Sequence, residues 1–421
     1  MEMGKAKINQ SRILGYILDS GEVSKAQIAK ELNLSMPTVL QTIKTLSEYD
    51  VLKEVGVYES TGGRKAKAIA VNEEYRYAIG LDITKNHIEI VLINMCSQVI
   101  KSVRKKKVFQ NSIEYCKSVS EEVEDFIEES KVVKEKILGV GISLPGIINY
   151  EERILIKSHA LELENISLKN LENAMNYPVY FENDANAALL AEKMIENDSV
   201  MYLSLSDTVG GAVCLEGKLF RGNKQRAGEF GHMILFPEGR RCYCGKKGCV
   251  DAYCSALLLK TEEDMSLEQF MEGVKNKDSE CVRIWNEYIN HLALVIVNLR
   301  MALDIDVILG GYVGHFLKNY MVELETKISE ENIFDNDVSF LRSCIFRREV
   351  SAVGVAKYFI KKYVNEVYLF KGRNGRVNFI RSYFEKNYSL FLFKTFAKRF
   401  IKYAQNVVKV FVKKGKIVAV K

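Results

Sequence analysis

The segment 228–251, with the sequence GEFGHMILFPEGRRCYCGKKGCVD, constrains the fold of this chain more than any other stretch. It brings one imidazole and three thiols together at short spacing, on His232, Cys242, Cys244 and Cys249. Thiolates and imidazoles are the ligands that Zn²⁺ prefers, and four of them complete a tetrahedral structural site. Glycines between the cysteines let so short a loop curl around one point. We therefore predict a loop tied by Zn²⁺.

Two carboxylates flank this loop, on Glu229 and Asp251, and folding around a metal would bring both close to the His232 imidazole. We interpret the segment as a zinc-tied loop that presents polar groups to a small polyol. Two other interpretations stay open: a purely structural zinc knuckle, and free cysteines that fill a core. Three cysteines within eight residues and an upstream histidine favour zinc over core filling.

The length of 421 residues predicts two or three domains. The composition, with 48% hydrophobic and 27% charged residues, is that of a globular protein. The first ten residues lack the apolar core of a secretory signal, and no uncharged apolar run is long enough to cross a bilayer. Nine cysteines without a secretory segment indicate thiols in a reducing compartment. We expect a cytoplasmic protein without a membrane segment.

Charge is distributed unevenly along the chain, whose net charge is +6. Residues 1–71 are slightly basic, and residues 72–365 are acidic. Residues 366–421 carry fourteen Lys or Arg and two Glu. Only the two ends of the chain therefore suit a polyanion such as nucleic acid.

Residues 1–71 have the pattern of a small DNA-binding domain. Apolar residues recur at helical spacing over residues 7–19, and further helices are expected over 25–32 and after Ser35, a plausible N-cap. In the third helix Val39, Leu40 and Ile43 would face the core. Two short helices joined by a tight turn form a helix-turn-helix, whose second helix lies in the major groove of DNA.

Polar side chains on the outer face of the third helix can hydrogen-bond to base edges and phosphates. A β-hairpin is expected next, over residues 51–58 and 64–71, with a Gly-Gly turn and a basic tip. Because of this basic wing we predict a winged helix-turn-helix rather than a small helical protein-interaction module. The predicted DNA-binding residues are Ser35, Thr38, Gln41, Thr42, Lys44 and Arg64.

Residues 72–365 alternate between strands and helices. Strands are expected within 77–94 and over 137–143, 179–182, 199–205, 212–216 and 307–309. Helices are expected over 112–130, 185–194, 266–275, 279–303, 314–329 and 351–365. This alternation predicts an α/β architecture, in which functional groups gather where strands end. A strand, a polar turn and a second strand occur twice, after Asp82 and around Thr208, and predict two similar halves around a cleft.

These motifs together resemble the ROK family, which comprises repressors, open reading frames and sugar kinases. The similar segments are 61–64 (TGGR), 144–146 (LPG), 182–187 (ENDANA), the GEFGHM stretch with its cysteine loop, and 309–311 (LGG). The resemblance covers about residues 8–365. It implies a winged helix-turn-helix followed by a two-lobed, actin-like (ribonuclease H-like) ROK domain with a zinc loop. It also implies a sugar-responsive repressor of the xylose or N-acetylglucosamine type.

The resemblance implies roles for individual residues. In the family an Asn-Asp pair binds sugar hydroxyls, and in the kinases the Asp deprotonates the attacking hydroxyl; the matching residues are Asn183 and Asp184. Glu229 and His232 carry over as sugar ligands, and His232 would bind zinc through one ring nitrogen and a hydroxyl through the other. Asp251 stands where the family usually has Glu, which shortens this side chain by one methylene.

The alternative function is an ATP-dependent sugar kinase with a DNA-binding head. ROK kinases carry glycine-rich phosphate loops, typically Asp-Gly-Gly-Thr-Lys and Gly-Thr-Gly-Ile-Gly-Gly, where this chain has DITKN at 82–86 and DTVGG at 207–211. β-Branched Ile83 would obstruct a backbone wrapped around phosphate. Because a kinase needs positioned phosphates and Mg²⁺ more than it needs a base, we predict a sensor without catalysis at Asp184.

We expect the head to bind a palindromic operator as part of a homodimer or a tetramer, and a bound monosaccharide to weaken that binding through the angle between the lobes. Residues 366–421 are a tail rich in Lys, Arg, Phe and Tyr. Three interpretations of the tail stay open: a basic surface for DNA or membrane, a small helical unit, and a sequence without a selected fold. His159 is expected at the surface and Trp285 in the core.

Overall fold

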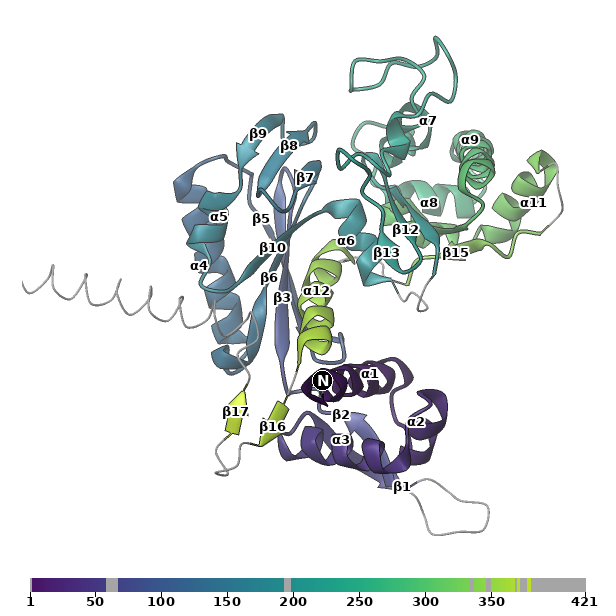
Figure 1. Ribbon diagram of the computed structural model, residues 1–421. Coiled ribbons are helices and arrows are strands. Elements are labelled where there is room, and N and C mark those ends of the chain that lie inside the picture. The colour runs from purple at the N-terminus through teal and green to yellow at the C-terminus, as the bar shows by residue number, and fades with distance from the viewer. Residues whose placement is uncertain are drawn as a thin grey trace, which may run out of the picture.

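A computed structural model describes residues 2–57, 67–192, 198–332, 337–345, 350–367, 369–371 and 377–379. A head precedes two lobes, each built on a five-stranded sheet (Figure 1). No helix in these ranges is both long and apolar enough to cross a membrane. The predicted wing tip at 61–64, with Arg64, lies outside the described residues.

The head consists of three helices and an antiparallel pair of strands. They are α1 (Glu2–Ser20), α2 (Lys25–Glu31), α3 (Met36–Glu48), β1 (Leu52–Val57) and β2 (Lys67–Val71). The hydroxyls of Ser24 and Ser35 accept hydrogen bonds from backbone N–H groups in the first turns of α2 and α3. These N–H groups have no partner within the helix, so the serines fix where α2 and α3 begin.

The first lobe is built on a sheet with the strand order β10-β6-β3-β4-β5. Its strands are β3 (Tyr77–Ile83), β4 (His87–Asn94), β5 (Val99–Lys106), β6 (Ile137–Leu144) and β10 (Val179–Asn183). Helices α4 (Ile113–Glu129) and α5 (Lys169–Ala174) lie on one side of the sheet, and α12 (Val350–Glu366) lies on the other (Figure 1). A small sheet of β7 (Ile147–Asn149), β8 (Ile154–Ser158) and β9 (Leu163–Ser167) was not predicted from the sequence.

The second lobe has the strand order β13-β12-β11-β14-β15. The strands are β11 (Val200–Leu205), β12 (Val209–Leu215), β13 (Lys218–Leu219), β14 (Asp306–Gly310) and β15 (Leu341–Ser343). The main helices are α6 (Asp184–Ala191), which connects the lobes, α8 (Leu267–Lys275), α9 (Ser279–Leu303), α10 (Gly311–Leu317) and α11 (Met321–Glu331). The single helix predicted over 314–329 is thus two helices, and Trp285 is 1% exposed, as predicted for a core residue.

Helix α12 packs against the first lobe at backbone contact. A Cβ atom on Gly80 of β3 would lie 1.8 Å from the carbonyl oxygen of Ala352 in α12. A Cβ on Gly354 of α12 would lie 1.7 Å from the carbonyl oxygen of Ala187 in α6. Real Cβ atoms do not approach other atoms this closely, so both positions require glycine. The start of the helix is therefore closely packed between β3 and α6.

The head and the first lobe share one hydrophobic core. It joins Ile13, Leu14 and Ile17 of α1 to Phe359 and Tyr363 of α12. The connection between β2 and β3 also contributes, because Tyr75 lies in the same core and the Tyr363 hydroxyl donates to Tyr75 Oη at 3.0 Å. Figure 1 shows α1 lying directly below the end of α12.

A strand beyond α12 completes this shared core. Leu369 of β16 (Leu369–Lys371) is 1% exposed, and the side chain of Gln10 binds its backbone on both sides. Gln10 Nε2 donates to the Leu369 carbonyl at 2.8 Å, and the Leu369 N–H donates to Gln10 Oε1 at 2.8 Å. β16 pairs with β17 (Val377–Phe379), and the predicted tail 366–421 otherwise lies almost wholly outside the described residues.

Replacement of Leu369 by Ala should destabilise the chain by about 2–5 kcal/mol, because it leaves a cavity between the head and the first lobe. The urea midpoint of unfolding measures this loss. Leu257→Ala is the matched control, since Leu257 is 57% exposed and its truncation should change stability by less than about 0.5 kcal/mol. Equal midpoints for the two variants would show that β16 does not contribute to the core.

Candidate metal centre and effector site

The predicted metal ligands come together in the second lobe. The ligand atoms of His232, Cys242, Cys244 and Cys249 all lie within 4.8 Å of one another. His232 ends a short 3₁₀ turn, Phe230–His232, and the cysteines lie on the loop that follows it. The loop returns through Gly248, whose φ is +80° and whose Cβ would lie 1.9 Å from the Phe236 carbonyl oxygen. This turn therefore excludes any residue other than glycine.

The donor set fits a tetrahedral metal ion. The Nδ1 atom of His232 is buried and has no hydrogen-bond partner among the described residues, which is unfavourable unless another group binds there. Burial raises the pKa of Cys242 to about 12 and lowers the pKa of His232. Only a cation beside the sulfurs would hold such a thiol as a thiolate at neutral pH. The cluster can therefore hold a metal ion, with His232 coordinated through Nδ1.

The cysteine loop is anchored to the second lobe by aromatic packing. The rings of Phe236, Tyr253 and His291 lie with centroids 4.9–5.3 Å apart, so the loop contacts α9 through His291. The Arg240 N–H donates to Tyr253 Oη at 2.6 Å, and the Arg240 guanidinium lies 4.8 Å from the Tyr253 ring centre. These contacts fix the base of the cysteine loop, and a metal ion would fix the remainder of the loop.

The predicted effector ligands face one another from two lobes. Asp184 begins α6 at the end of β10, and Glu229 lies on the second lobe next to the metal cluster. Burial, and after it the charges of Asp82 and Glu229, raises the pKa of Asp184 to about 7. Burial also raises the pKa of Asp82 to about 6 and that of Glu229 above its ordinary value. The charges of Asp82 and Glu229 thus act on Asp184, and the three carboxyl groups form a polar site suited to hydroxyl groups.

Asn183 is held in a fixed orientation by its own hydrogen bonds. Its Oδ1 accepts from the Asn186 N–H at 3.0 Å and caps α6. Its Nδ2 donates to the Gly146 carbonyl at 3.0 Å and to Asp184 Oδ1 at 2.8 Å. Asn183 therefore positions Asp184 and joins it to the turn after β6.

Asp251 binds protein backbone in this structure. It is 5% exposed, and its Oδ2 accepts from the Val209 N–H at the start of β12 at 2.7 Å. Burial raises its pKa to about 6. The glycines of this strand also serve packing, because a Cβ on Gly211 would lie 2.2 Å from the Phe230 ring. The 207–211 segment thus supports the metal loop.

Two aromatic side chains that the sequence did not assign to the site surround His232. Its Nε2 lies 3.4 Å from Tyr243 Oη, so this phenol stands where the family resemblance implies a sugar hydroxyl. His159, from the turn after β8 in the first lobe, lies with its ring centre 5.7 Å from His232 and 5.8 Å from Tyr243. His159 is exposed, as expected, but it also bridges the lobes. Their residue types alone did not indicate that Tyr243 and His159 lie at this site.

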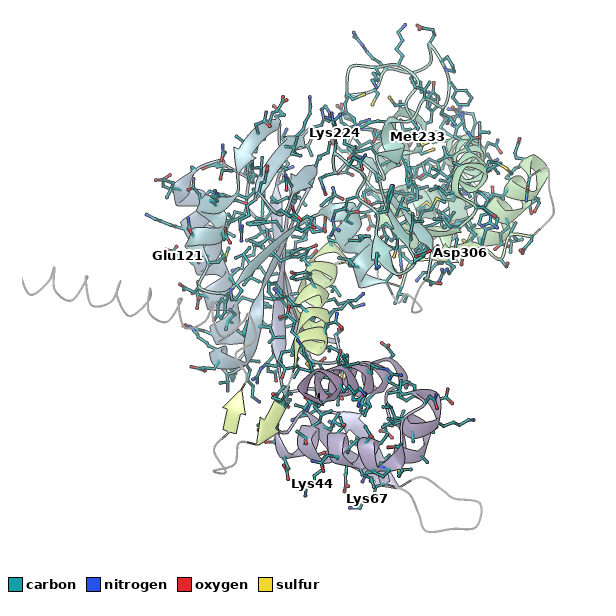
Figure 2. The ribbon with its side chains drawn as sticks, in the orientation of Figure 1. Lys44, Lys67, Glu121, Lys224, Met233 and Asp306 are labelled. Carbon is teal, nitrogen blue, oxygen red and sulfur yellow. The ribbon has the colours of Figure 1, made fainter. Side chains whose placement is uncertain are left out.

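Helix α3 exposes a different set of residues than predicted. Gln41 and Lys44 are exposed, and Thr38 is half-buried with its hydroxyl 2.8 Å from that of Ser35. Thr42 is 8% exposed and packs on the inner face with Val39, Ile43 and Leu46, so its predicted exposure is wrong. Leu40, predicted to face the core, is 46% exposed because it falls one residue beyond that stripe. Figure 2 shows Lys44 on the face of the head away from both lobes.

Comparison with known proteins shows both regulators and kinases with this fold. A crystal structure of a ROK family transcriptional regulator, a homologue of the E. coli MLC protein, covers 86% of this chain and 98% of its own at a TM-score of 0.68 and 20% identity. A ROK glucokinase from Streptomyces griseus, solved with glucose and AMPPNP, covers 67% of this chain and 98% of its own at a TM-score of 0.57 and 20% identity. The shared fold is that of a sugar-kinase-like α/β protein.

Relatives in sequence are repressors. The xylose repressor of Bacillus subtilis is 30% identical over 267 residues, which are 61% of this chain and 69% of that protein. A putative xylose repressor of a Caldicellulosiruptor species is 26% identical over 353 residues, 78% of this chain and 88% of its own. The chain matches the ROK family over residues 78–360, and it belongs to this family.

The raised pKa of Asp184 predicts a pH-dependent stability. A carboxyl group whose pKa rises from 3.8 unfolded to about 7 folded binds a proton more strongly in the folded chain. Its contribution to stability is present below about pH 4 and is lost as the pH rises to about 7. At pH 8, the free energy of unfolding of Asp184→Asn should therefore exceed that of wild type by at least about 1 kcal/mol. Urea denaturation measures this difference.

The control for this prediction is Asp207→Asn, on an exposed carboxylate of the neighbouring turn. Its stability should parallel that of wild type from about pH 5 to about pH 8. The same pH profile for Asp184→Asn and wild type would contradict the assignment of a proton to Asp184.

Proposed function

We propose that this chain is a transcriptional repressor whose affinity for operator DNA is controlled by a monosaccharide. The observation that carries the proposal is the head, packed through α12 onto a sugar-kinase-like domain. The repressors named above support it, because the 353-residue match is too long for the two lobes alone. The ROK regulator structure likewise covers 86% of the chain, whereas the glucokinase covers 67%.

The head is a winged helix-turn-helix in this proposal, with residues 1–71 as the DNA-binding domain and 72–365 as the effector domain. α2 and α3 form the helix-turn-helix, and β1 and β2 form the base of the wing. Gln41 reads a base edge and Lys44 binds phosphate or guanine, with Ser35, Thr38 and Arg64 as further contacts. Exposed Leu40 adds a surface that suits a thymine methyl group. A homodimer, alone or within a tetramer, presents two such helices to a palindromic site.

The effector site lies between the lobes in this proposal. Asn183 and Asp184 approach the sugar from the first lobe, and Glu229, His232 and Asp251 approach it from the second. A half-protonated carboxyl group both donates to and accepts from hydroxyl groups, which suits a neutral polyol. The relatives' names favour a xylose-like or N-acetylglucosamine-like effector. Binding changes operator affinity only if the sugar prefers one lobe angle over another.

Zn²⁺ is the metal that the cluster favours, since three thiolates and one imidazole are a common structural zinc set. The ion would supply no reaction and would fix the loop that carries His232 and Tyr243. His232 would bind it through Nδ1, which leaves Nε2 facing Tyr243 and the effector.

Two features weigh against the sugar kinase alternative. Strand β3 runs through Asp82 and buried Ile83 into a tight turn in which the Thr84 N–H donates to the His87 carbonyl at 2.9 Å. A backbone so arranged offers a phosphate fewer N–H groups than a glycine-rich loop. Gly211 is required for contact with Phe230 instead. Asp184 has a pKa suited to a base, but a base without phosphate contacts does not make a kinase.

The test of this function uses full-length protein and DNA selected by it from a random pool. D-xylose, D-glucose and N-acetyl-D-glucosamine are added in turn, and fluorescence anisotropy gives the operator Kd. We expect one sugar to raise this Kd by about 5- to 150-fold. Gln41→Ala should weaken specific binding by about 5- to 150-fold, whereas Lys117→Ala, on the first lobe, should not. ATP consumption that requires the sugar, without effect on DNA binding, would favour the kinase.

Removal of a metal ligand should abolish the sugar response. Wild type should contain about one zinc per chain by elemental analysis, and Cys242→Ser should contain almost none. Without the ion the loop that carries His232 loses its fixed shape, so the sugar should no longer raise the melting temperature. Cys116→Ser, on α4, is the matched control and should keep both properties. A zinc-free protein with a normal sugar response would contradict the role given to the loop.

A further inference from the structure

A buried ion pair connects the two lobes next to the effector site. Arg221 follows β13 of the second lobe, and its guanidinium donates to Glu182 Oε2 at the end of β10 in the first lobe. Glu182 is 2% exposed. Figure 2 shows Lys224, three residues after Arg221, between the lobes, so this segment reaches across from one to the other. A carboxylate this deeply buried depends on its cation, because an unpaired charge there is strongly unfavourable.

The other oxygen of Glu182 holds the effector segment. Oε1 accepts from the Asn183 N–H at 3.0 Å and from Asn186 Nδ2 at 3.0 Å. Asn183 in turn donates to Asp184 Oδ1 at 2.8 Å. A displacement of Arg221 therefore moves the carboxylate that positions the first-lobe sugar ligands. The reverse also holds, since a ligand that shifts Asp184 changes the environment of Glu182.

Tyr180 extends this network to α12. Its hydroxyl donates to Glu182 Oε2 and lies 3.2 Å from the Arg221 guanidinium. Its ring stacks on the ring of Tyr358 in α12, with centroids 3.6 Å apart and planes inclined by 6°. The Arg221 guanidinium also lies 4.7 Å from the ring centre of Tyr150, which closes the network on its outer side.

Helix α12 connects Tyr358 to the head. Tyr180 belongs to the same hydrophobic core as Ile13 and Ile17 of α1, and Tyr358 packs against that core. A Cβ on Gly15 of α1 would lie 3.8 Å from Val364 Cγ1, so the head lies close to α12 one turn and a half beyond Tyr358. The effector segment is thus connected to Tyr358 by hydrogen bonds, an ion pair and a stacked ring, and Tyr358 is connected to the head by α12 and its apolar contacts with α1.

We propose that Arg221, Glu182, Tyr180 and Tyr358 form the relay through which the angle between the lobes sets the orientation of the DNA-binding head. The proposal rests on the proposed function. Arg221 moves with the second lobe, and the buried pair resists separation, so rotation of that lobe pulls on Tyr180 and its stacking partner. Arg221 and Tyr358 are positioning residues, because neither is placed among the sugar or DNA ligands.

The test separates sugar binding from its transmission to DNA. Operator Kd is measured with full-length protein, without sugar and with a saturating amount of D-xylose or N-acetyl-D-glucosamine, whichever raises the melting temperature more. The ratio of the two values is the coupling factor. Tyr358→Ala should bring this factor to within about twofold of one, while sugar Kd and sugar-free operator Kd stay within about twofold of wild type. Tyr358→Phe keeps the stacked ring and should keep the wild-type factor.

The matched control is Tyr320→Ala in the second lobe, where a half-buried tyrosine packs on Trp285 with ring centres 5.0 Å apart. It should leave the coupling factor unchanged. If Tyr358→Ala fails to fold, Arg221→Lys serves instead. It keeps the charge beside Glu182 but loses the reach to Tyr180, so it should lower the factor while sugar still binds.

A Tyr358→Ala protein with the wild-type coupling factor would overturn the relay and leave the proposed function intact. A wild-type protein that binds operator but shows no response to D-xylose, D-glucose or N-acetyl-D-glucosamine would contradict the proposed function, and the relay with it. An equal loss of the coupling factor in Tyr358→Ala and Tyr320→Ala would show that general destabilisation causes the effect, and it would also overturn the relay.

Discussion

The contact on which the rest of the molecule depends is the backbone packing of α12 against β3 and α6. Gly80 and Gly354 leave no room for a Cβ at this contact, so the helix cannot slide without a clash. Packed interiors of this kind respond to stress by moving as units rather than by deforming. The first residues of α12 are consequently fixed to β3 and α6, while the rest of the helix carries Tyr358 and Tyr363 toward the core shared with the head, to which Leu369 adds a buried side chain. A signal from the effector segment can therefore reach the head through the part of α12 that lies beyond this contact.

The second lobe is organised around the metal loop in a comparable way. Gly211 lets Phe230 pack on β12, Asp251 accepts from the Val209 N–H, and Tyr253 fixes Arg240 at the base of the loop. These contacts place His232 and Glu229 opposite Asp184 without any flexible connection. Only the short stretch from Cys242 to Cys249 would depend on a metal ion for its shape. The predicted effector residues of both lobes are thus held by hydrogen-bonded elements.

The sequence predicted the elements that have strong apolar periodicity and the metal ligands, because closely spaced cysteines have few other uses. It missed β5, whose side chains alternate between exposed and half-buried, because an edge strand with four basic residues lacks an apolar run. It placed Thr42 and Leu40 on the wrong faces of α3, since the buried stripe runs through Val39, Thr42, Ile43 and Leu46 and a threonine in it gives no apolar signal.

Residues that act across the lobes could not be found from the sequence either. Arg221, His159 and Tyr243 are single residues without a motif. Arg221 pairs with Glu182, and His159 packs on Tyr243, so each of these contacts joins residues far apart in the chain. Local patterns describe which element a residue belongs to, whereas contacts between lobes depend on how the elements are finally arranged. Asp251, predicted as a sugar ligand, also accepts from the Val209 N–H through Oδ2, a backbone contact that its residue type does not indicate.

The charges around Asp82 also favour a sensor over a kinase. Phosphoryl transfer relies on metal ions that neutralise phosphate charge and leave with the nucleotide. In this chain Arg104 of β5 lowers the pKa of Asp82 by its charge, against the larger effect of burial. The same guanidinium lies 3.5 Å from Tyr312 Oη on α10 of the second lobe. This guanidinium supplies a positive charge beside Asp82 from within the chain, so that charge does not depend on a metal ion bound with a nucleotide.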